Sequence, residues 1–174
     1  MLAYVFWHRP DGSLEPAEYE RRLGAFHARL AATSPAGFVR SAAFRVTGAG
    51  WLGDGYEDWY LVDDWASLGL LNQAAVDAVR RPDHDAVAGV AGAGSGGVYA
   101  PRAGTLPLGA ERAAAWSDKP RGVAYADCED RLTAGRRAGE FALWQRQLVL
   151  GPAPELCLRS AAGPGAALAP VWAP

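Results

Sequence analysis

Residues 56–87, YEDWYLVDDWASLGLLNQAAVDAVRRPDHDAV, decide the fold of the chain. Residues 56–65 carry the aromatic and β-branched side chains of a strand, which two consecutive aspartates should end. Residues 67–80 then have the spacing of an amphipathic helix. One face of that helix carries Leu68, Leu71 and Ala75. A strand therefore leads directly into a helix.

The helix is predicted to end near Arg81, because Pro82 disfavours helical backbone at the residue before it. A polar turn that carries His84 should follow. Residues 97–100 have the composition of the next strand.

The chain before this stretch alternates in the same way. Residues 3–8 are aromatic and β-branched, and we expect the first strand there. Pro16 opens a helix, since its missing N–H costs nothing in the first turn. An apolar stripe along this helix is formed by Tyr19, Leu23, Phe26 and Leu30. Residues 38–47 form the second strand, and a glycine-rich loop over 48–55 joins it as a hairpin to the third.

Residues 1–101 thus have the order strand, helix, strand, strand, helix, strand. This is the ferredoxin-like βαββαβ arrangement, an antiparallel sheet with both helices on one face. The fold class is α+β. A linker is expected over 102–115, which is rich in Ala, Gly and Pro.

Residues 116–174 resemble a truncated copy of the beginning, and an internal repeat is predicted in which 122–162 matches 3–43 as a β-α-β unit. Tyr125 would stand at the head of a strand, as Tyr4 does. A helix would carry Phe141, Trp144 and Leu148. The string RSAA occurs at 159–162 and at 40–43.

A sheet with helices on one face must cover the other. The helix-facing side chains are expected to be Val5, Val39, Ala43, Leu156 and Leu158. The opposite face is expected to hold Tyr4, Phe6, His8, Phe38, Arg40, Phe44, Tyr125, Asp127 and Arg159. Because this second face is aromatic and charged, it should meet another sheet, from the second half or from another subunit, and leave a cavity between them.

Composition excludes several functions. A net charge of −2 provides no basic field for nucleic acid. No apolar run is long enough for a membrane helix, and the first residues lack the pattern of a signal peptide, so we expect a soluble, cytoplasmic protein. Two cysteines, Cys128 and Cys157, have no metal-type spacing and are expected to be core thiols. No metal site is visible among three dispersed histidines.

Two glycine patterns, at 48–53 and at 92–97, match G-x-G-x-x-G. Neither follows a strand and opens a helix, so the anion site of a dinucleotide fold is absent. We expect no cofactor.

The run from Trp59 to Val87 resembles the dimeric α+β barrel superfamily. The resemblance lies in a strand, an acidic residue with an aromatic one, a helix and then Pro82-x-His84-x-x-Val87. The opening strand and the helix from Pro16 are similar in layout to the EthD-like and NIPSNAP-like branches, and a stress-responsive A/B barrel is a third related branch. The resemblance implies antiparallel sheets that pair as a barrel, and the superfamily includes polyketide cyclases, cofactor-free monooxygenases and isomerases.

The resemblance points to His84 as a general base, because the matching histidine has that role in some members. An imidazole titrates near neutrality, and a neighbouring aspartate can orient it. A structural role, bracing the end of the second helix, is the alternative for His84. His27 is expected to be structural. The other candidate ligand-binding residues are Tyr4, Phe6, His8, Arg40, Tyr60, Tyr125 and Arg159. The alternative role of the two arginines is to form ion pairs across the sheet.

These observations predict a small-molecule-binding protein whose ligand is aromatic or polyketide-like, working as a homodimer. A cyclase, isomerase or cofactor-independent monooxygenase with His84 as base is one alternative. A non-catalytic structural or assembly protein is another.

Overall fold

The computed structural model describes residues 1–49, 51, 53–149, 151 and 153–173. Eight strands, four α-helices and one short 3-10 helix make up this part of the chain. The first half contains β1 (Leu2–Pro10), α1 (Pro16–Ala32), β2 (Phe38–Thr47), β3 (Gly55–Val62), α2 (Trp65–Ala75), α3 (Arg81–Ala88) and β4 (Ala91–Gly104). The second contains β5 (Ala113–Ser117), α4 (Tyr125–Thr133), η1 (Ala138–Glu140), β6 (Phe141–Val149), β7 (Leu156–Ser160) and β8 (Ala166–Trp172).

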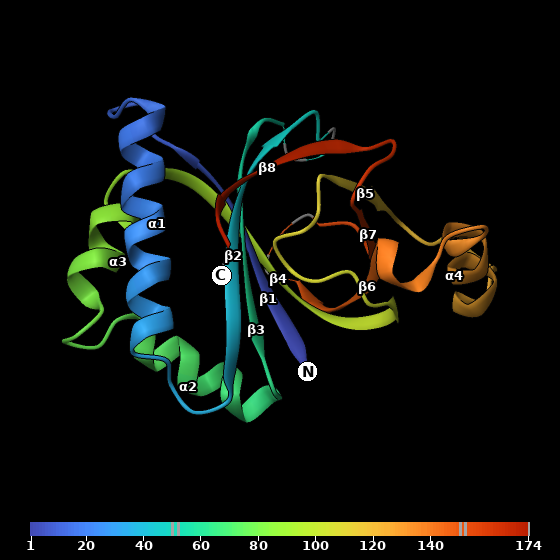
Figure 1. Cartoon of the computed structure of the whole chain (residues 1–174), viewed down its shortest axis with the longest axis horizontal. Helices are drawn as coiled ribbons and strands as arrows, with labels where there is room; N and C mark the ends of the chain where they lie inside the picture. Colours follow the sequence, from blue (N-terminus) through green and yellow to red (C-terminus); the bar gives the residue numbers. More distant parts are fainter. Residues whose placement is uncertain (50, 52, 150, 152, 174) are drawn as a thin grey trace.

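All eight strands form one closed antiparallel barrel in the order β1-β3-β2-β8-β5-β7-β6-β4. Strands β2 and β4, at the two edges of the first half, pair with β8 and β6 of the second. Helices α1, α2 and α3 lie outside the strands of the first half, and α4 lies at the opposite end of the molecule (Figure 1). The barrel closes within one chain.

The barrel interior is filled by alternate side chains from every strand. The buried cluster there includes Val5 and Trp7 of β1, Phe44 of β2, Trp59 of β3 and Trp144 of β6. A second cluster lies between α1–α3 and the outside of the sheet, and it contains the stripe Tyr19, Leu23, Phe26 and Leu30 that the sequence predicts. The protein thus has one core inside the barrel and another beneath the helices.

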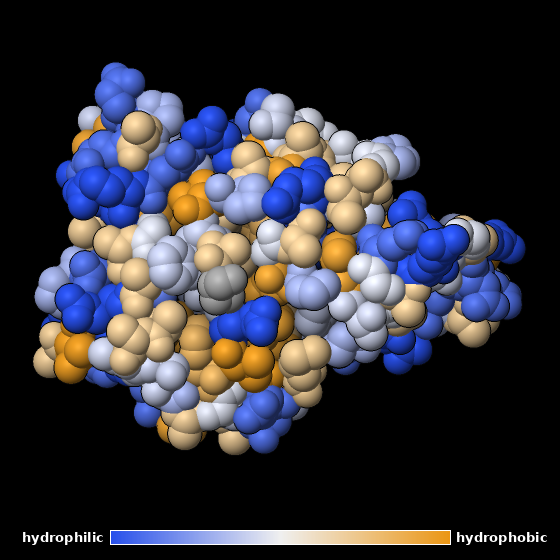
Figure 2. All heavy atoms as spheres, in the orientation of Figure 1, coloured by the Kyte–Doolittle hydropathy of each residue, from blue (hydrophilic) through white to orange (hydrophobic). Residues whose placement is uncertain are grey.

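The outer surface follows the same division. Hydrophilic side chains cover the parts of the molecule over α1 and α4, and hydrophobic ones gather toward the lower middle of the view (Figure 2). Several large apolar side chains of α2 and the turn after it are exposed, Trp65, Leu70, Val76 and Val79.

The predicted second helix is in fact two helices. The α2 helix ends at Ala75, and α3 begins at Arg81 with Pro82 in its first turn, where proline is tolerated. The prediction that Pro82 ends the helix and that His84 lies in a polar turn was therefore wrong. Strand β4 is longer than the predicted 97–100, and only residues 105–112 of the predicted linker lie between strands. In the first glycine pattern, Gly50 and Leu52 lie outside the described residues.

The predicted match of 122–162 to 3–43 was wrong in its elements. Tyr125 begins helix α4, and residues 141–149 form strand β6. Period-two alternation decides this strand, because Ala142 and Trp144 face the barrel interior whereas Phe141 and Leu143 pack outside. The helical spacing of 141, 144 and 148 is incidental. The second half has four strands rather than a truncated β-α-β unit.

The prediction of which strand side chains face the helices was correct for only some of the residues. Ala43 and Leu158 lie on the outer side with the helices, and Phe44 and Arg159 lie inside the barrel, as expected. The faces of β1 were reversed, since Val5 is inside and Tyr4, Phe6 and His8 face the helices. Both faces of this strand are aromatic and apolar, so its sequence pattern does not show which side is inward.

The assignments of Phe38, Val39, Arg40, Tyr125 and Asp127 were wrong as well. Phe38 packs on the helix side. Val39, Arg40 and Asp127 are exposed, as is Tyr125 at the start of α4. A shift in strand register between Phe38 and Arg40 breaks the alternation on which their faces were predicted.

Candidate ligand pocket between the helices and the sheet

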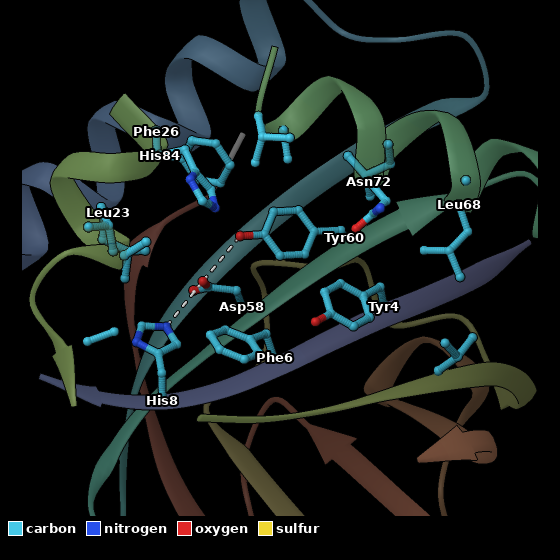
Figure 3. A pocket seen from close by; sticks show the side chains of 18 of the residues that line it. Tyr4, Phe6, His8, Leu23, Phe26, Asp58, Tyr60, Leu68, Asn72 and His84 are labelled. Atoms are coloured by element: carbon cyan, nitrogen blue, oxygen red, sulfur yellow. Dashed lines mark hydrogen bonds and ion pairs between the residues drawn. The ribbon is translucent and has the colours of Figure 1, made fainter. Parts of the chain in front are cut away.

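A pocket of about 590 Å³ lies between α1–α3 and the outside of β1, β3 and β4. The sequence places Tyr4, Phe6 and His8 on a cavity between two sheets, which was wrong for these residues, because they line this pocket outside the barrel. Most of the lining is aliphatic or aromatic, and Trp65, Val76 and Leu148 contribute exposed apolar side chains to it. The polar lining consists of Tyr4, His8, Tyr19, Asp58, Tyr60, Asn72 and His84. Figure 3 shows Tyr4, His8, Asp58 and Tyr60 on the strands, with Asn72 on α2 and His84 on α3 facing the same pocket.

Strand alternation places the pocket floor. In β1 the side chains of Tyr4, Phe6 and His8 face outward, and in the antiparallel β3 their register partners are Tyr60, Asp58 and Tyr56. Side chains directly opposite on one face of an antiparallel pair lie close enough to interact. The floor is thus two neighbouring rows of three residues, with one carboxylate among five rings.

The rings of the floor lie nearly parallel to their neighbours. Tyr4 has its ring centroid 6.1 Å from that of Tyr60 and 6.5 Å from that of Phe6. His8 continues the row, 5.4 Å from Phe6 and 5.8 Å from Tyr56. The four interplanar angles lie between 17° and 24°. This surface suits a ligand with flat aromatic or conjugated rings.

Asp58 is the centre of a buried polar network. Its Oδ2 lies 3.1 Å from Nε2 of His8 and accepts a hydrogen bond from the Tyr60 hydroxyl at 3.2 Å. Its Oδ1 lies 3.5 Å from Nε2 of His27, whose Nδ1 is 2.7 Å from the Ser41 hydroxyl. Helix α1 supplies His27 and also Tyr19, whose hydroxyl is 2.6 Å from Nδ1 of His8. All of these groups are buried.

Burial and charge act in opposite directions on Asp58. Burial by itself raises the pKa of the carboxyl, but the charge of His8 and the hydrogen bonds from His27 and His8 outweigh it and hold the pKa below its ordinary value. Burial raises the pKa of Tyr60, and the Asp58 charge raises it further. Burial and Asp58 have the same effect on the pKa of Tyr19. The floor therefore holds one carboxylate surrounded by neutral phenols.

His84 lies on the opposite wall of the pocket, on α3. Its ring meets that of Phe26 edge-on at 5.7 Å, and its Nδ1 is 2.9 Å from the Asp85 carboxylate. The side chain is 32% exposed. Among the described residues, Nε2 of His84 makes no hydrogen bond, so this nitrogen is available to a ligand.

The predicted site residues divide into two groups. The structure brings Tyr4, Phe6, His8, Tyr60 and His84 together around one pocket. The other three lie elsewhere, for different physical reasons. Arg40 is exposed on β2, and the hydroxyl of Tyr125 bonds Glu155 at the surface. Arg159 lies inside the barrel and pairs with Glu57 and Glu111, the ion-pair alternative that the sequence left open.

Sequence reasoning missed Asp58 and Tyr19, and it assigned His27 a purely structural role. A signal for Asp58 was present, since two consecutive carboxylates, Glu57 and Asp58, among the aromatic residues of a strand place one on each face, where each requires a buried partner. Tyr19 and His27 on the apolar stripe of α1 likewise require buried polar partners. The pairing of these residues with His8 depends on how the helix sits on the sheet.

Comparisons with solved structures agree with the architecture. An anthrone oxidase-like protein superposes with a TM-score of 0.60 at 9% sequence identity, over 92% of this chain and 73% of that one. The likeness is one of fold, an α+β barrel. The eight-stranded barrel of this protein closes within one polypeptide chain. A proposed chlorite dismutase superposes more loosely, with a TM-score of 0.44 at 12% identity, over 91% of this chain and 78% of that one. No family model and no curated protein matches the sequence at a significant level.

Two further features concern membranes and metals. Among the described residues, no helix is both long and apolar enough to cross a membrane. Within the same part of the chain, no group of three or more His, Cys, Asp or Glu side chains has the arrangement of a metal site.

Proposed function

We propose that this α+β barrel protein binds a flat, largely apolar small molecule in the pocket between α1–α3 and the sheet. The observation that carries the proposal is the floor of near-parallel rings with a buried carboxylate network at its centre. A volume of about 590 Å³ is ordinary for a small-molecule site, and such sites combine apolar walls with few polar groups. The ligand class is aromatic or polyketide-like, because stacked rings recognise flat conjugated systems.

A binding experiment with a defined probe tests this proposal. We expect 2-methoxyanthraquinone, a flat apolar molecule, to bind saturably at one site and to quench tryptophan fluorescence. Trp65 lines the pocket and is 54% exposed, so its emission should respond.

A variant that narrows the pocket provides the specificity control. Gly69 lines the pocket, and a Cβ built there meets nothing within 4 Å. Gly69→Trp should weaken probe binding by at least about tenfold, which corresponds to about 1.4 kcal/mol. Gly24→Trp on α1 is the matched control, since its Cβ is equally free and the residue does not line the pocket. Equal affinities in the two variants, or no binding at all, would refute the pocket as the ligand site.

A second candidate function is catalysis by a cyclase, isomerase or cofactor-independent monooxygenase with His84 as general base. Its support is the position of His84 on the pocket wall, with Asp85 on Nδ1 and Nε2 unpaired in the described structure. Removing a general base lowers turnover by roughly 10²–10⁴-fold. His84→Ala should therefore abolish turnover of an accepted substrate while leaving the melting temperature unchanged. The opposite pattern, a lower melting temperature with ligand affinity retained, identifies a structural histidine. A non-catalytic assembly protein is the remaining alternative, and it predicts that no probe binds.

We further propose that the two halves predicted at 1–101 and 116–174 are copies of one internally repeated unit, with their bounds extended to the end of β4 at Gly104 and the start of β5 at Ala113. The supporting observation is the strand order, in which β4-β1-β3-β2 is followed by β8-β5-β7-β6 with the same relative order. In this alignment β5, β6, β7 and β8 correspond to β1, β2, β3 and β4, and α4 corresponds to α1. The second half has a short connection over 161–165 where the first half has α2 and α3.

A homodimer also stays a prediction, but for a different reason from the one given by the sequence. The second half of the chain completes the barrel, so no partner is needed to cover the sheet. The exposed apolar side chains of α2 and the following turn, with Trp65 at 54% and Val79 at 55% exposure, are the surface that favours association. Light scattering that gives the monomer mass would refute it. Cytoplasmic localisation is supported by two cysteines that are both free and buried.

A further inference from the structure

The hydrogen bonds around His8 form a continuous chain from α1 to β3. The hydroxyl of Tyr19 lies 2.6 Å from Nδ1 of His8, and Nε2 of His8 lies 3.1 Å from Oδ2 of Asp58. Both ring nitrogens of His8 are therefore engaged by protein groups. His8 does not meet a ligand directly, which differs from the simple ligand contact that the sequence predicts.

The chemistry of the partners fixes the direction of these hydrogen bonds. An ionised carboxylate only accepts, so Nε2 of His8 carries the proton and donates to Asp58. Before the relay takes up a proton the His8 ring is neutral, so its other nitrogen is an acceptor and the Tyr19 hydroxyl donates to it. The charged ring, whose charge lowers the pKa of Asp58, is the state of the relay after proton uptake. The oxygen of Tyr19 thus has only lone pairs left for another donor. Tyr19 is one of the residues that line the pocket, and it is 0% exposed to solvent.

This arrangement is that of a hydroxyl, an imidazole and a carboxylate in series, the order used by hydrolase triads. The imidazole is able to take the hydroxyl proton because the carboxylate on its far side stabilises the resulting imidazolium. His27 supports the same carboxylate from the other side, with Nε2 at 3.5 Å from Oδ1.

A purely structural role explains the network poorly. Asp58 is 3% exposed, and removing a carboxylate from water is expensive unless its partners compensate. Apolar residues of similar volume stabilise a protein interior at least as well as such a cluster. The network also lies at the pocket floor, the place where a ligand would meet it.

We propose that Tyr19, His8 and Asp58 form a proton-accepting relay that takes the proton of an acidic aromatic hydroxyl, a phenol or enol, on the bound ligand. This proposal rests on the proposed function of the pocket. The ligand O–H bond breaks and its proton goes to the Tyr19 oxygen, while the Tyr19 proton passes to Nδ1 of His8. The ligand is left as an oxyanion and His8 as an imidazolium held by Asp58, so charge and atoms balance without a further reactant.

The surroundings match an oxyanion. The ring of Tyr4 belongs to the same floor. Its hydroxyl makes no hydrogen bond within the described part of the chain, so it can donate to the ligand oxygen. Tyr56 stacks on His8 from β3, and Tyr60 donates to Asp58. The remaining titratable groups that face the relay are His27 from α1 and His84 from α3.

A spectroscopic titration tests the relay without any turnover. The probe is 2-hydroxyanthraquinone, a flat phenol whose visible absorption moves to longer wavelength when it ionises. An apolar pocket alone disfavours the charged form and raises the pKa of a bound phenol. The relay has the opposite effect, so we expect the bound probe to ionise at a pH at least about one unit lower than the free probe, a tenfold change in its ionisation constant.

Substitutions assign the effect to the relay. In Tyr19→Phe and Asp58→Asn the bound probe should ionise at or above the pH of the free probe. Tyr125→Phe is the matched control, because this tyrosine is exposed on α4 and bonds Glu155 away from the pocket. It should behave as the wild type. Tyr19→Phe removes one hydroxyl from an otherwise unchanged ring, so it keeps the test valid if Asp58→Asn fails to fold.

The possible outcomes separate the two proposals. If the probe binds but ionises as it does in water, or at higher pH, the relay is overturned and the pocket remains. The relay is likewise overturned if Tyr19→Phe leaves ionisation unchanged while His84→Gln abolishes it, because His84 is then the base. If neither this probe nor 2-methoxyanthraquinone binds, the proposed function fails, and the relay as a ligand base fails with it.

Discussion

Replacing Arg159 with methionine should destabilise the protein strongly, because its guanidinium is the cation inside the barrel that pairs with two carboxylates. Arg159 on β7 and Glu57 on β3 are both fully buried, and Glu111 is 1% exposed. The guanidinium donates to Glu57 through Nη1 and to Glu111 through Nε, the latter at 3.1 Å. It also lies over the rings of Phe44 and Trp59, at 4.6 and 4.4 Å.

The expected loss follows from these contacts. Burial by itself lowers the pKa of Arg159, but the charges of Glu57 and Glu111 outweigh it and hold the pKa above its ordinary value, so the group is charged. Removing one partner of a buried ion pair costs about 3–5 kcal/mol, since it leaves an uncompensated charge. Urea unfolding monitored by tryptophan fluorescence, with a slope of about 2 kcal/mol per M, should then show a midpoint lower by about 2 M.

Two further variants decide whether buried charge is the cause. Arg102→Met removes an arginine whose Nε is 2.8 Å from Glu129, but this pair is at the surface and should contribute only about 0–1 kcal/mol. Adding Glu57→Gln to Arg159→Met should recover about 1 kcal/mol or more, because the amide removes one of the two unpaired charges. Trp7 and Trp59 donate to different oxygens of Glu57, so the amide oxygen keeps one of these two indole hydrogen bonds. Equal losses in Arg159→Met and Arg102→Met, or no recovery in the double variant, would refute the reasoning.

Two other predictions concern backbone fit and pH. Gly37 has φ of +74°, and a Cβ there would lie 2.0 Å from Oγ of Ser67. Gly37→Ala should therefore lower the melting temperature clearly more than Gly12→Ala, because Gly12 has a similar φ of +86° but open space around it. Similar losses of melting temperature in the two variants would contradict the clash with Ser67. The pKa of Asp58 is lower in the folded protein than its ordinary value. The ionised carboxylate therefore stabilises the folded state above about pH 4, and this stabilisation is lost as the pH falls below that value. Each unit by which folding lowers the pKa corresponds to about 1.4 kcal/mol. Unfolding free energies measured between pH 3 and 7 should fall less steeply with acidification in Asp58→Asn than in the wild type, and parallel curves would show that the carboxylate contributes nothing through its ionisation.

Local pattern was sufficient for much of the first half. The helix that Pro16 opens and the strand over 38–47 lie where the sequence places them. In both, one strong periodicity agrees with clear end signals, a proline in the first turn and glycine-rich segments around the strand. The same reasoning failed over 141–149, because Phe141, Trp144 and Leu148 satisfy helical spacing by chance while the full segment alternates.

The sequence by itself determined the α+β class, the amphipathic first helix, and the gathering of Tyr4, Phe6, His8, Tyr60 and His84 on elements that meet. Only the tertiary structure decided that the barrel closes within the chain and that the pocket lies outside it, beneath the helices. The physical reason is that the two faces of β1 and β3 are alike, both aromatic and aliphatic, with one carboxylate on each face of β3. Alternation therefore separates two sets of side chains without showing which set is inward. The relay also depends on which side chains of β1 and β3 face outward. Tyr19, His8 and Asp58 come from three elements, and only the packing of α1 on the outward set brings a hydroxyl, an imidazole and a carboxylate into one chain of hydrogen bonds.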